Sequence, residues 1–300
     1  MTPTDRTPPV VLSVAGTDSG GAAGLAADLA TFGHLGTHGA CVVTAVTAQD
    51  TTGVRAIHEI PVAVVAAQLD AVLDDLPVAA MKTGMLGSAE VVRLLGRRWA
   101  EGATGRPLVV DPVLVATSGA VLGDDAVVAA YREHLLPVAT VVTPNQAEAR
   151  VLTGLDGPTP VVAARLAELG CAVVLTGGPE WGPPGSRGAG PSDPVTCTDW
   201  LALPGEPAVP LRHRAVPTEN DHGTGCTHSA ALAAALAHGA GPMQAALAAA
   251  AYTTCRLATG ATWRLGRGRG PVAHVAPTTD DPNPDDPNPD EPPNPEGAPT

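Results

Sequence analysis

Short, continuously apolar segments alternate with longer stretches of helical spacing along most of the chain. The apolar runs predict strands at residues 10–15, 41–46, 78–81, 108–110, 140–142 and 172–175. Between them, apolar residues recur with helical spacing at 25–35, 62–75, 89–99, 125–135 and 160–169. This alternation favours a mostly parallel sheet with helices on both faces, and the unbroken apolar character of the strands fits burial on both sides.

The pattern changes in the last third of the chain. Glycine and proline are frequent over residues 179–200, which predicts a mobile loop. Residues 195–203 and 209–216 then have the character of an antiparallel strand pair. Two alanine-rich helices follow at 223–238 and 242–257, because alanine is the strongest helix former.

The final segment repeats Asp-Pro-Asn-Pro-Asp and is rich in acidic residues. It has too little apolar surface to offset the entropy lost on ordering, so we expect disorder. We therefore divide the chain into a flexible N-terminus at 1–9, one domain at 10–275 and a disordered acidic tail at 276–300.

Polar or glycine-rich signatures follow strand after strand at the predicted carboxyl ends. They begin at Gly16-Thr17-Asp18, Thr47-Ala48-Gln49, Lys82-Thr83-Gly84, Asp111-Pro112-Val113, Thr143-Pro144-Asn145 and Thr176-Gly177-Gly178. Ligands of open α/β sheets bind at that edge. We expect the six signatures to meet in one crevice.

The entrance to the predicted helix at 223–238 has the features of an anion site. Gly223, Thr224 and Gly225 leave backbone N–H groups open at the positive end of the helix dipole, where phosphate binds well. Cys226 lies in the first turn, which favours the thiolate, so we expect the pKa of this thiol to be lowered. The alternative is a tight turn followed by a small core cysteine.

Composition narrows the class of protein. The chain has 300 residues, 44% of them apolar and only 2% aromatic, so its core is aliphatic. Its net charge of −13 includes the acidic tail, and no basic patch indicates a nucleic-acid partner. No segment has the character of a membrane span or signal peptide, so we expect a cytoplasmic protein. Five cysteines without CxxC spacing argue against a disulfide framework and a zinc site. Lys82 is the only lysine, which excludes a Walker-type loop.

Taken in order, these motifs resemble the ribokinase-like superfamily, and within it the hydroxymethylpyrimidine/phosphomethylpyrimidine kinases. The resemblance covers residues 10–274 and includes His222-Gly223-Thr224-Gly225-Cys226-Thr227 and Lys82-Thr83-Gly84-Met85-Leu86. It implies a three-layer α/β/α sandwich with a mostly parallel central sheet. It also implies ATP-dependent phosphorylation of a pyrimidine hydroxymethyl group and then of the monophosphate, by an enzyme that forms homodimers.

The resemblance assigns the phosphate-handling residues. The backbone of residues 223–226 forms the anion hole, and Cys226 is the candidate base. Asn145 and Glu148 match an Asn-x-x-Glu motif that organises Mg²⁺ with phosphate, and Asp111 supports the same charge network. Thr176 and Gly178 belong to the ATP site. Asn145 and Glu148 also have the spacing of a helix capping box, which is the alternative interpretation.

The resemblance also assigns the pyrimidine contacts. The amide of Gln49 can both donate to and accept from an aminopyrimidine edge. Asp28 is the second polar contact, with the Gly16 backbone nearby. Met85 and Val113 cover the ring faces, although apolar residues of this kind usually belong to the core.

Three positions depart from the family pattern. Ala22 replaces a glycine and narrows the first loop, Thr176 replaces a lysine, and Asp221 replaces a threonine and brings a negative charge near the anion hole. His222 is expected to orient its loop. Two alternatives remain open at this point: a pyridoxal kinase of the same fold, and a pyrimidine-binding regulatory protein without catalysis.

Overall fold

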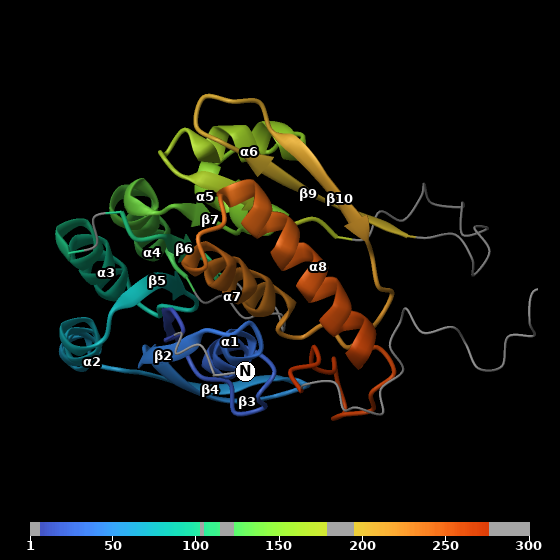
Figure 1. Cartoon of the computed structure of the whole chain (residues 1–300), viewed down its shortest axis with the longest axis horizontal. Coiled ribbons are helices and arrows are strands. Elements are labelled where there is room, and N and C mark those ends of the chain that lie inside the picture. Colours follow the sequence, from blue (N-terminus) through green and yellow to red (C-terminus); the bar gives the residue numbers. More distant parts are fainter. Residues whose placement is uncertain (1–6, 103–104, 115–122, 179–194, 276–300) are drawn as a thin grey trace, which may run out of the picture.

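The computed structural model describes residues 7–102, 105–114, 123–178 and 195–275. The predicted tail at 276–300, residues 1–6 of the predicted flexible N-terminus and residues 179–194 of the predicted loop lie outside these ranges. Three layers, helices on either side of a central sheet, make up the described part (Figure 1). Of its helices, none is long and apolar enough to cross a membrane.

Eight strands form the central sheet in the order β10-β9-β8-β7-β6-β5-β1-β2. Their bounds are β1 Val10–Ala15, β2 His38–Val43, β5 Val78–Thr83, β6 Leu108–Val110, β7 Val141–Val142, β8 Ala172–Leu175, β9 Thr196–Ala202 and β10 Val209–Arg214. Neighbours from β2 to β8 pair in parallel, and β9 runs antiparallel to both β8 and β10. The mostly parallel sheet and the antiparallel pair are thus confirmed.

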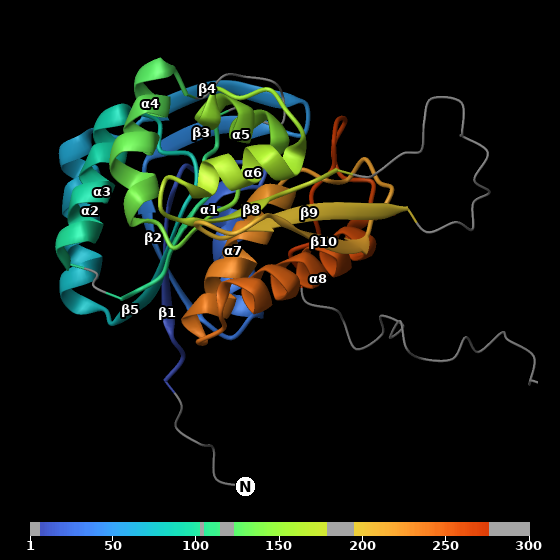
Figure 2. The ribbon, with the colours of Figure 1, turned by 90° about the horizontal axis from the view of Figure 1, so that it is seen from above.

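Helices cover both faces of this sheet (Figure 2). On one face lie α1 Gly24–His34, α7 Thr224–Ala237 and α8 Pro242–Gly260; on the other lie α2 Val62–Asp75, α3 Ala89–Gly102, α4 Asp125–Ala130, α5 Gln146–Thr153 and α6 Thr159–Ala167. Each face has its own apolar cluster, built almost entirely from Val, Leu and Ala. Buried alanines along α7 allow close packing against α8, α1 and the sheet, which holds the start of α7 at the sheet edge.

The prediction of one strand at 41–46 is wrong. The chain instead ends β2 at Val43 and begins β3 Ala45–Asp50, which pairs with β4 Gly53–Glu59 in a separate two-stranded sheet. Alternating exposure along β3 and almost continuous exposure of β4 explain why no long apolar run marks this hairpin. Gln49 therefore lies on a hairpin beside the central sheet.

Two further boundaries differ from the prediction. The α-helix expected at 125–135 ends at Ala130, and a π-helical turn follows over Tyr131–Leu135. The Tyr131 side chain in this turn is buried in the core. The loop expected through residue 200 ends earlier, because β9 begins at Thr196 and pairs with β8 and β10.

Candidate active site

A cavity of about 310 Å³ lies at the carboxyl ends of the central strands. All six strand-end signatures contribute to its wall, through Gly16, Gln49, Met85, Asp111, Asn145 and Thr176 among others. The entrance to α7 closes another side with residues 223–226. The predicted convergence of the six signatures on one crevice is confirmed.

The start of α7 has the geometry of an anion site. Gly223 is its N-cap, with φ of +92°, and no side chain caps this end of the helix. A Cβ on Gly223 would lie 1.8 Å from the carbonyl oxygen of Ala22, so only glycine fits. The hydroxyl and the backbone N–H of Thr224 donate to the Asp221 carbonyl at 2.6 and 3.2 Å, and residues 223–226 all line the cavity.

Cys226 lines the cavity, but its predicted ionisation is wrong. Burial raises the pKa of this thiol to about 12, Lys82 opposes the rise, and Asp111 and Asp28 add to it. Desolvation of the buried thiolate is the largest cause, and it outweighs the helix dipole, which favours the thiolate. Without ligands, Cys226 is a neutral thiol at pH 7.

Asn145 and Glu148 form a complete capping box at the start of α5. The Asn145 side chain accepts the Glu148 N–H at 2.9 Å, and Glu148 Oε2 accepts the Asn145 N–H at 3.0 Å. Both residues also line the cavity, so the capping interpretation and the ligand-binding interpretation are compatible.

Glu148 and Asp111 are two buried carboxyl groups on the same cavity. Burial raises the pKa of Glu148 to about 8, and the charge of Asp111 adds to the effect. Burial likewise raises the pKa of Asp111, against the opposing charge of Lys82 and a hydrogen bond from Ser229 at 2.9 Å. A divalent cation with oxygen ligands would relieve this repulsion, so the pair fits Mg²⁺.

Asp28 forms a buried ion pair with Lys82. Its side chain is fully buried and does not line the cavity. Lys82 Nζ donates to both carboxylate oxygens, at 2.8 and 2.9 Å, and the Ser13 hydroxyl donates to one of them at 2.6 Å. These bonds engage both oxygens of the Asp28 carboxylate in the ligand-free chain, and its contact with a pyrimidine stays a prediction.

Lys82 is the site residue whose role the sequence analysis missed. Burial alone would lower the pKa of its ammonium, but Asp28, Cys226 and Asp111 raise that pKa above its usual value. Lys82 thus stays charged beside the buried carboxyl groups of Asp28 and Asp111. Its being the only lysine in the chain, in an apolar strand, was the available signal.

Gln49 is held in the cavity by His222. The Gln49 amide nitrogen lies 2.8 Å from His222 Nε2, and the same imidazole nitrogen lies 3.2 Å from Asp18 Oδ2. Burial of Asp18 opposes its ionisation, but His222 and three backbone N–H donors bring the net pKa of the carboxyl below its ordinary value. His222 therefore orients a side chain, consistent with its predicted positioning role.

The remaining predicted residues divide into two groups. Gly16, Met85, Val113 and Thr176 all line the cavity. A Cβ on Gly16 would lie 2.5 Å from the terminal methyl of Met85, so the thioether packs on bare backbone. Gly178 is exposed and does not line the cavity, and its assignment to the ATP site stays a prediction.

The charge of Asp221 is compensated. Arg269 Nε donates to its carboxylate at 2.7 Å, and a second guanidinium nitrogen bonds the other oxygen. Asp221 lines the cavity, so the repulsion of phosphate expected from this departure is reduced by the adjacent arginine.

Comparisons with known proteins agree with this geometry. The family described as phosphomethylpyrimidine kinase matches residues 18–273. A hydroxymethylpyrimidine/phosphomethylpyrimidine kinase of Rhizobium meliloti is 45% identical over 271 residues, which cover 88% of this chain and 96% of the relative.

Among solved structures, an ADP complex of Bacillus subtilis pyridoxal kinase superposes with a TM-score of 0.77 at 33% identity, covering 89% of this chain and 98% of that one. Phosphomethylpyrimidine kinase of Clostridium difficile gives a TM-score of 0.67 at 30% identity, covering 82% and 98%. The fold is thus ribokinase-like. On these sequence matches, the chain belongs to the phosphomethylpyrimidine kinase family.

Proposed function

We propose that this chain is a cytoplasmic, ATP-dependent kinase of thiamine biosynthesis. It phosphorylates 4-amino-5-hydroxymethyl-2-methylpyrimidine and then converts the monophosphate to the diphosphate. One observation carries the proposal: a single cavity joins an oriented amide at Gln49, an uncapped helix entrance at Gly223 and two carboxyl groups at Asp111 and Glu148. These features correspond to a heteroaromatic ring, a transferring phosphoryl group and a divalent cation.

The residues around Gln49 bind and orient the pyrimidine. Its amide pairs with the aminopyrimidine edge, while His222 holds the amide in place. Met85 and Val113 supply apolar contact to the ring, and the Gly16 backbone lies beside them. With the ring held there, the hydroxymethyl group can reach the start of α7.

The phosphate end of the cavity provides charge stabilisation. Mg²⁺ with ATP would neutralise the charge that develops on the transferring phosphoryl group. Glu148 and Asp111 are the residues that would hold the ion, with Asn145 beside them. Backbone N–H groups at Gly225 and Cys226 bind the phosphoryl oxygens at the positive end of α7. Thr176 offers this region only a hydroxyl in place of the lysine expected from the family.

Cys226 is the proposed acceptor of the hydroxyl proton. Its raised pKa of about 12 in the free protein means that the thiol must lose its proton before it can accept another. Phosphoryl transfer depends mainly on positioning and charge stabilisation, so the base contributes only part of the rate. A cation at Asp111 would lower the thiol pKa by offsetting the negative charge that raises it.

ADP formation by the purified chain tests the proposal directly. Hydroxymethylpyrimidine, its monophosphate and pyridoxal are offered separately with Mg²⁺-ATP. Turnover of both pyrimidines well above pyridoxal is the expected result, with kcat reduced about 10²- to 10⁴-fold in Cys226→Ala. Retained pyrimidine binding without turnover in Glu148→Gln would support the Mg²⁺ role. A folded protein with no turnover of any substrate contradicts the proposal.

A pyridoxal kinase is the second candidate. The higher TM-score to the pyridoxal kinase of Bacillus subtilis favours it, whereas the higher sequence identity to the Rhizobium meliloti relative favours the pyrimidine. Preferential turnover of pyridoxal would keep the mechanism and change the substrate. We also propose a homodimer, as the family resemblance implies; light scattering on the purified chain would measure its mass.

A further inference from the structure

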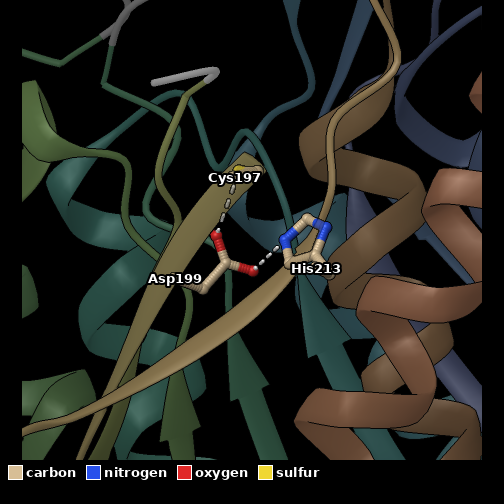
Figure 3. A group of neighbouring side chains, drawn as sticks. All are labelled: Cys197, Asp199 and His213. Atoms are coloured by element: carbon tan, nitrogen blue, oxygen red, sulfur yellow. Dashed lines mark hydrogen bonds and ion pairs between the residues drawn. The ribbon is translucent and has the colours of Figure 1, made fainter. Parts of the chain in front are cut away.

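Three potential metal ligands lie together outside the active site, on the antiparallel pair β9–β10 (Figure 3). Within the described ranges they form a group in which one ligand atom each from Cys197, Asp199 and His213 lies within 4.8 Å of the others. Strand register explains the grouping, since His213 pairs directly with Cys197 and Asp199 lies two residues further along the same face. No spacing motif along the chain indicates such a site, because the ligands come from two strands.

The order of contacts excludes a cysteine hydrolase triad. His213 Nε2 lies 3.1 Å from Asp199 Oδ2, and Cys197 Sγ lies 3.9 Å from Asp199 Oδ1. The carboxylate is therefore between the other two groups, as Figure 3 shows. In a triad the imidazole lies between the nucleophile and the acid, and each partner bonds a different ring nitrogen.

The surroundings of the three groups match the outer shell of a metal site. The second Asp199 oxygen accepts the Gly177 N–H at 2.8 Å, which fixes the carboxylate. His213 Nδ1 faces the Arg214 carbonyl and the Thr254 hydroxyl, each at 3.3 Å, so Nε2 is the ring nitrogen available to an ion that replaces the Nε2 proton beside Asp199. Outer hydrogen bonds of this kind orient metal-binding histidines and carboxylates.

Charge and access also fit a divalent cation. Cys197 and Asp199 are buried, whereas the His213 side chain is 24% exposed and opens a path from solvent. One thiolate and one carboxylate balance two positive charges, so an occupied site is neutral. Sulfur, nitrogen and oxygen ligands together select a borderline-soft ion such as Zn²⁺ over Mg²⁺.

We propose that Cys197, Asp199 and His213 form a binding site for one Zn²⁺-class ion, with a water molecule as the fourth ligand. The site is separate from the kinase cavity and does not depend on the proposed activity. In the occupied site Cys197 would bind as a thiolate and His213 as a neutral imidazole. The groups that act on this imidazole are Asp199 and Cys197 from β9, with the buried His228 of α7 nearby.

The test must distinguish metal binding from a simple ion pair between His213 and Asp199. In the metal-free chain His213 Nε2 lies 3.1 Å from Asp199 Oδ2, so an ion must replace this contact. The full chain, stripped of metal, is titrated with Zn²⁺ by calorimetry at pH 7 and pH 8 without nucleotide. We expect one ion per chain at both pH values.

Variants distinguish this site from adventitious binding. Cys197→Ser and His213→Gln each remove one ligand and are expected to weaken Zn²⁺ at least about 100-fold, the upper range for losing even an outer-shell partner. Cys255→Ser and His58→Gln change an exposed cysteine and an exposed histidine, and should leave the affinity unchanged.

Cobalt gives a second measurement that does not depend on the variants folding. Co²⁺ bound to the unmodified chain should show a thiolate charge-transfer band, and Zn²⁺ should displace it while Mg²⁺ does not. Absence of stoichiometric binding at pH 8, absence of the thiolate band, or equal weakening by Cys255→Ser would each overturn the proposal.

Discussion

Replacing Lys82 with methionine tests the central electrostatic feature of the site. Lys82 and Asp28 are both fully buried, and the ammonium donates to both carboxylate oxygens at 2.8 and 2.9 Å. Lys82→Met keeps the length and apolar packing of the side chain but leaves the Asp28 carboxylate without its cation. Removing one member of a buried ion pair costs about 3–5 kcal/mol, because the other charge remains desolvated.

That cost is large relative to the total stability of a domain. Native domains are stable by about 5–15 kcal/mol, and 1 kcal/mol corresponds to about 2–4 °C in a chain of this size range. Lys82→Met should therefore lower the unfolding midpoint by about 6–20 °C. Combining it with Asp28→Asn removes the orphan charge while keeping an acceptor for the Ser13 hydroxyl, so more than half of the loss should be recovered.

Urea unfolding followed by circular dichroism measures the loss of unfolding free energy in Lys82→Met and its recovery in the double variant. The slope with denaturant should match that of the parent chain, which confirms that the same surface unfolds. A loss below about 1 kcal/mol in Lys82→Met would refute the charge argument. So would a double variant no more stable than the single one, because the cost would then come from packing.

Four further outcomes follow from the geometry. Gly223→Ala should destabilise the chain by at least about 3 kcal/mol, because φ is positive and the added Cβ would lie 1.8 Å from a carbonyl oxygen. In Gly225→Ala the added Cβ has room, so this control variant should fold, and thermal melts compare the two. Gln49→Ala should raise KM for the pyrimidine roughly tenfold or more, with KM for ATP unchanged in steady-state assays. Burial lowers the pKa of His274 to about 4, so the unfolded chain binds a proton more readily than the folded chain between pH 6.5 and 4. The free energy of unfolding should fall over this range by up to about 1.4 kcal/mol per pH unit, and urea titrations of His274→Gln should lack this decrease. Thr176→Lys should restore part of the ATP binding lost when EDTA removes Mg²⁺, measured by calorimetry.

The sequence predicted the architecture because the strands of the central sheet are buried on both faces. Val10–Ala15 is buried at every position, and a run of that kind is recognisable without tertiary information. The hairpin carrying Gln49 was missed since its strands alternate between exposed and buried positions and end at a polar turn. Tertiary contacts, rather than periodicity, set its position beside the cavity.

Most residues that line the cavity were predictable from the sequence, but their charge states were less so. Residues such as Asn145 and Glu148 follow a strand directly, so their place at the sheet edge follows from topology. The ionisation of Cys226 depends on which charges surround it, and no spacing rule reports that Asp111 and Lys82 lie nearby. The buried ion pair of Asp28 was missed for the same reason, because its partner Lys82 is 54 residues away in the chain.

The distribution of charge supports the proposed role of a divalent cation. Of the described residues that line the cavity, none is a lysine or arginine, and four are acidic: Asp18, Asp111, Glu148 and Asp221. Lys82 is directed to Asp28, Arg269 to Asp221, and Thr176 adds no charge. The positive end of α7 is worth only about half an elementary charge. On the proposed function, a nucleotide with several negative charges would therefore need a metal ion at this edge, because the acidic residues that would repel free ATP would attract its Mg²⁺ complex.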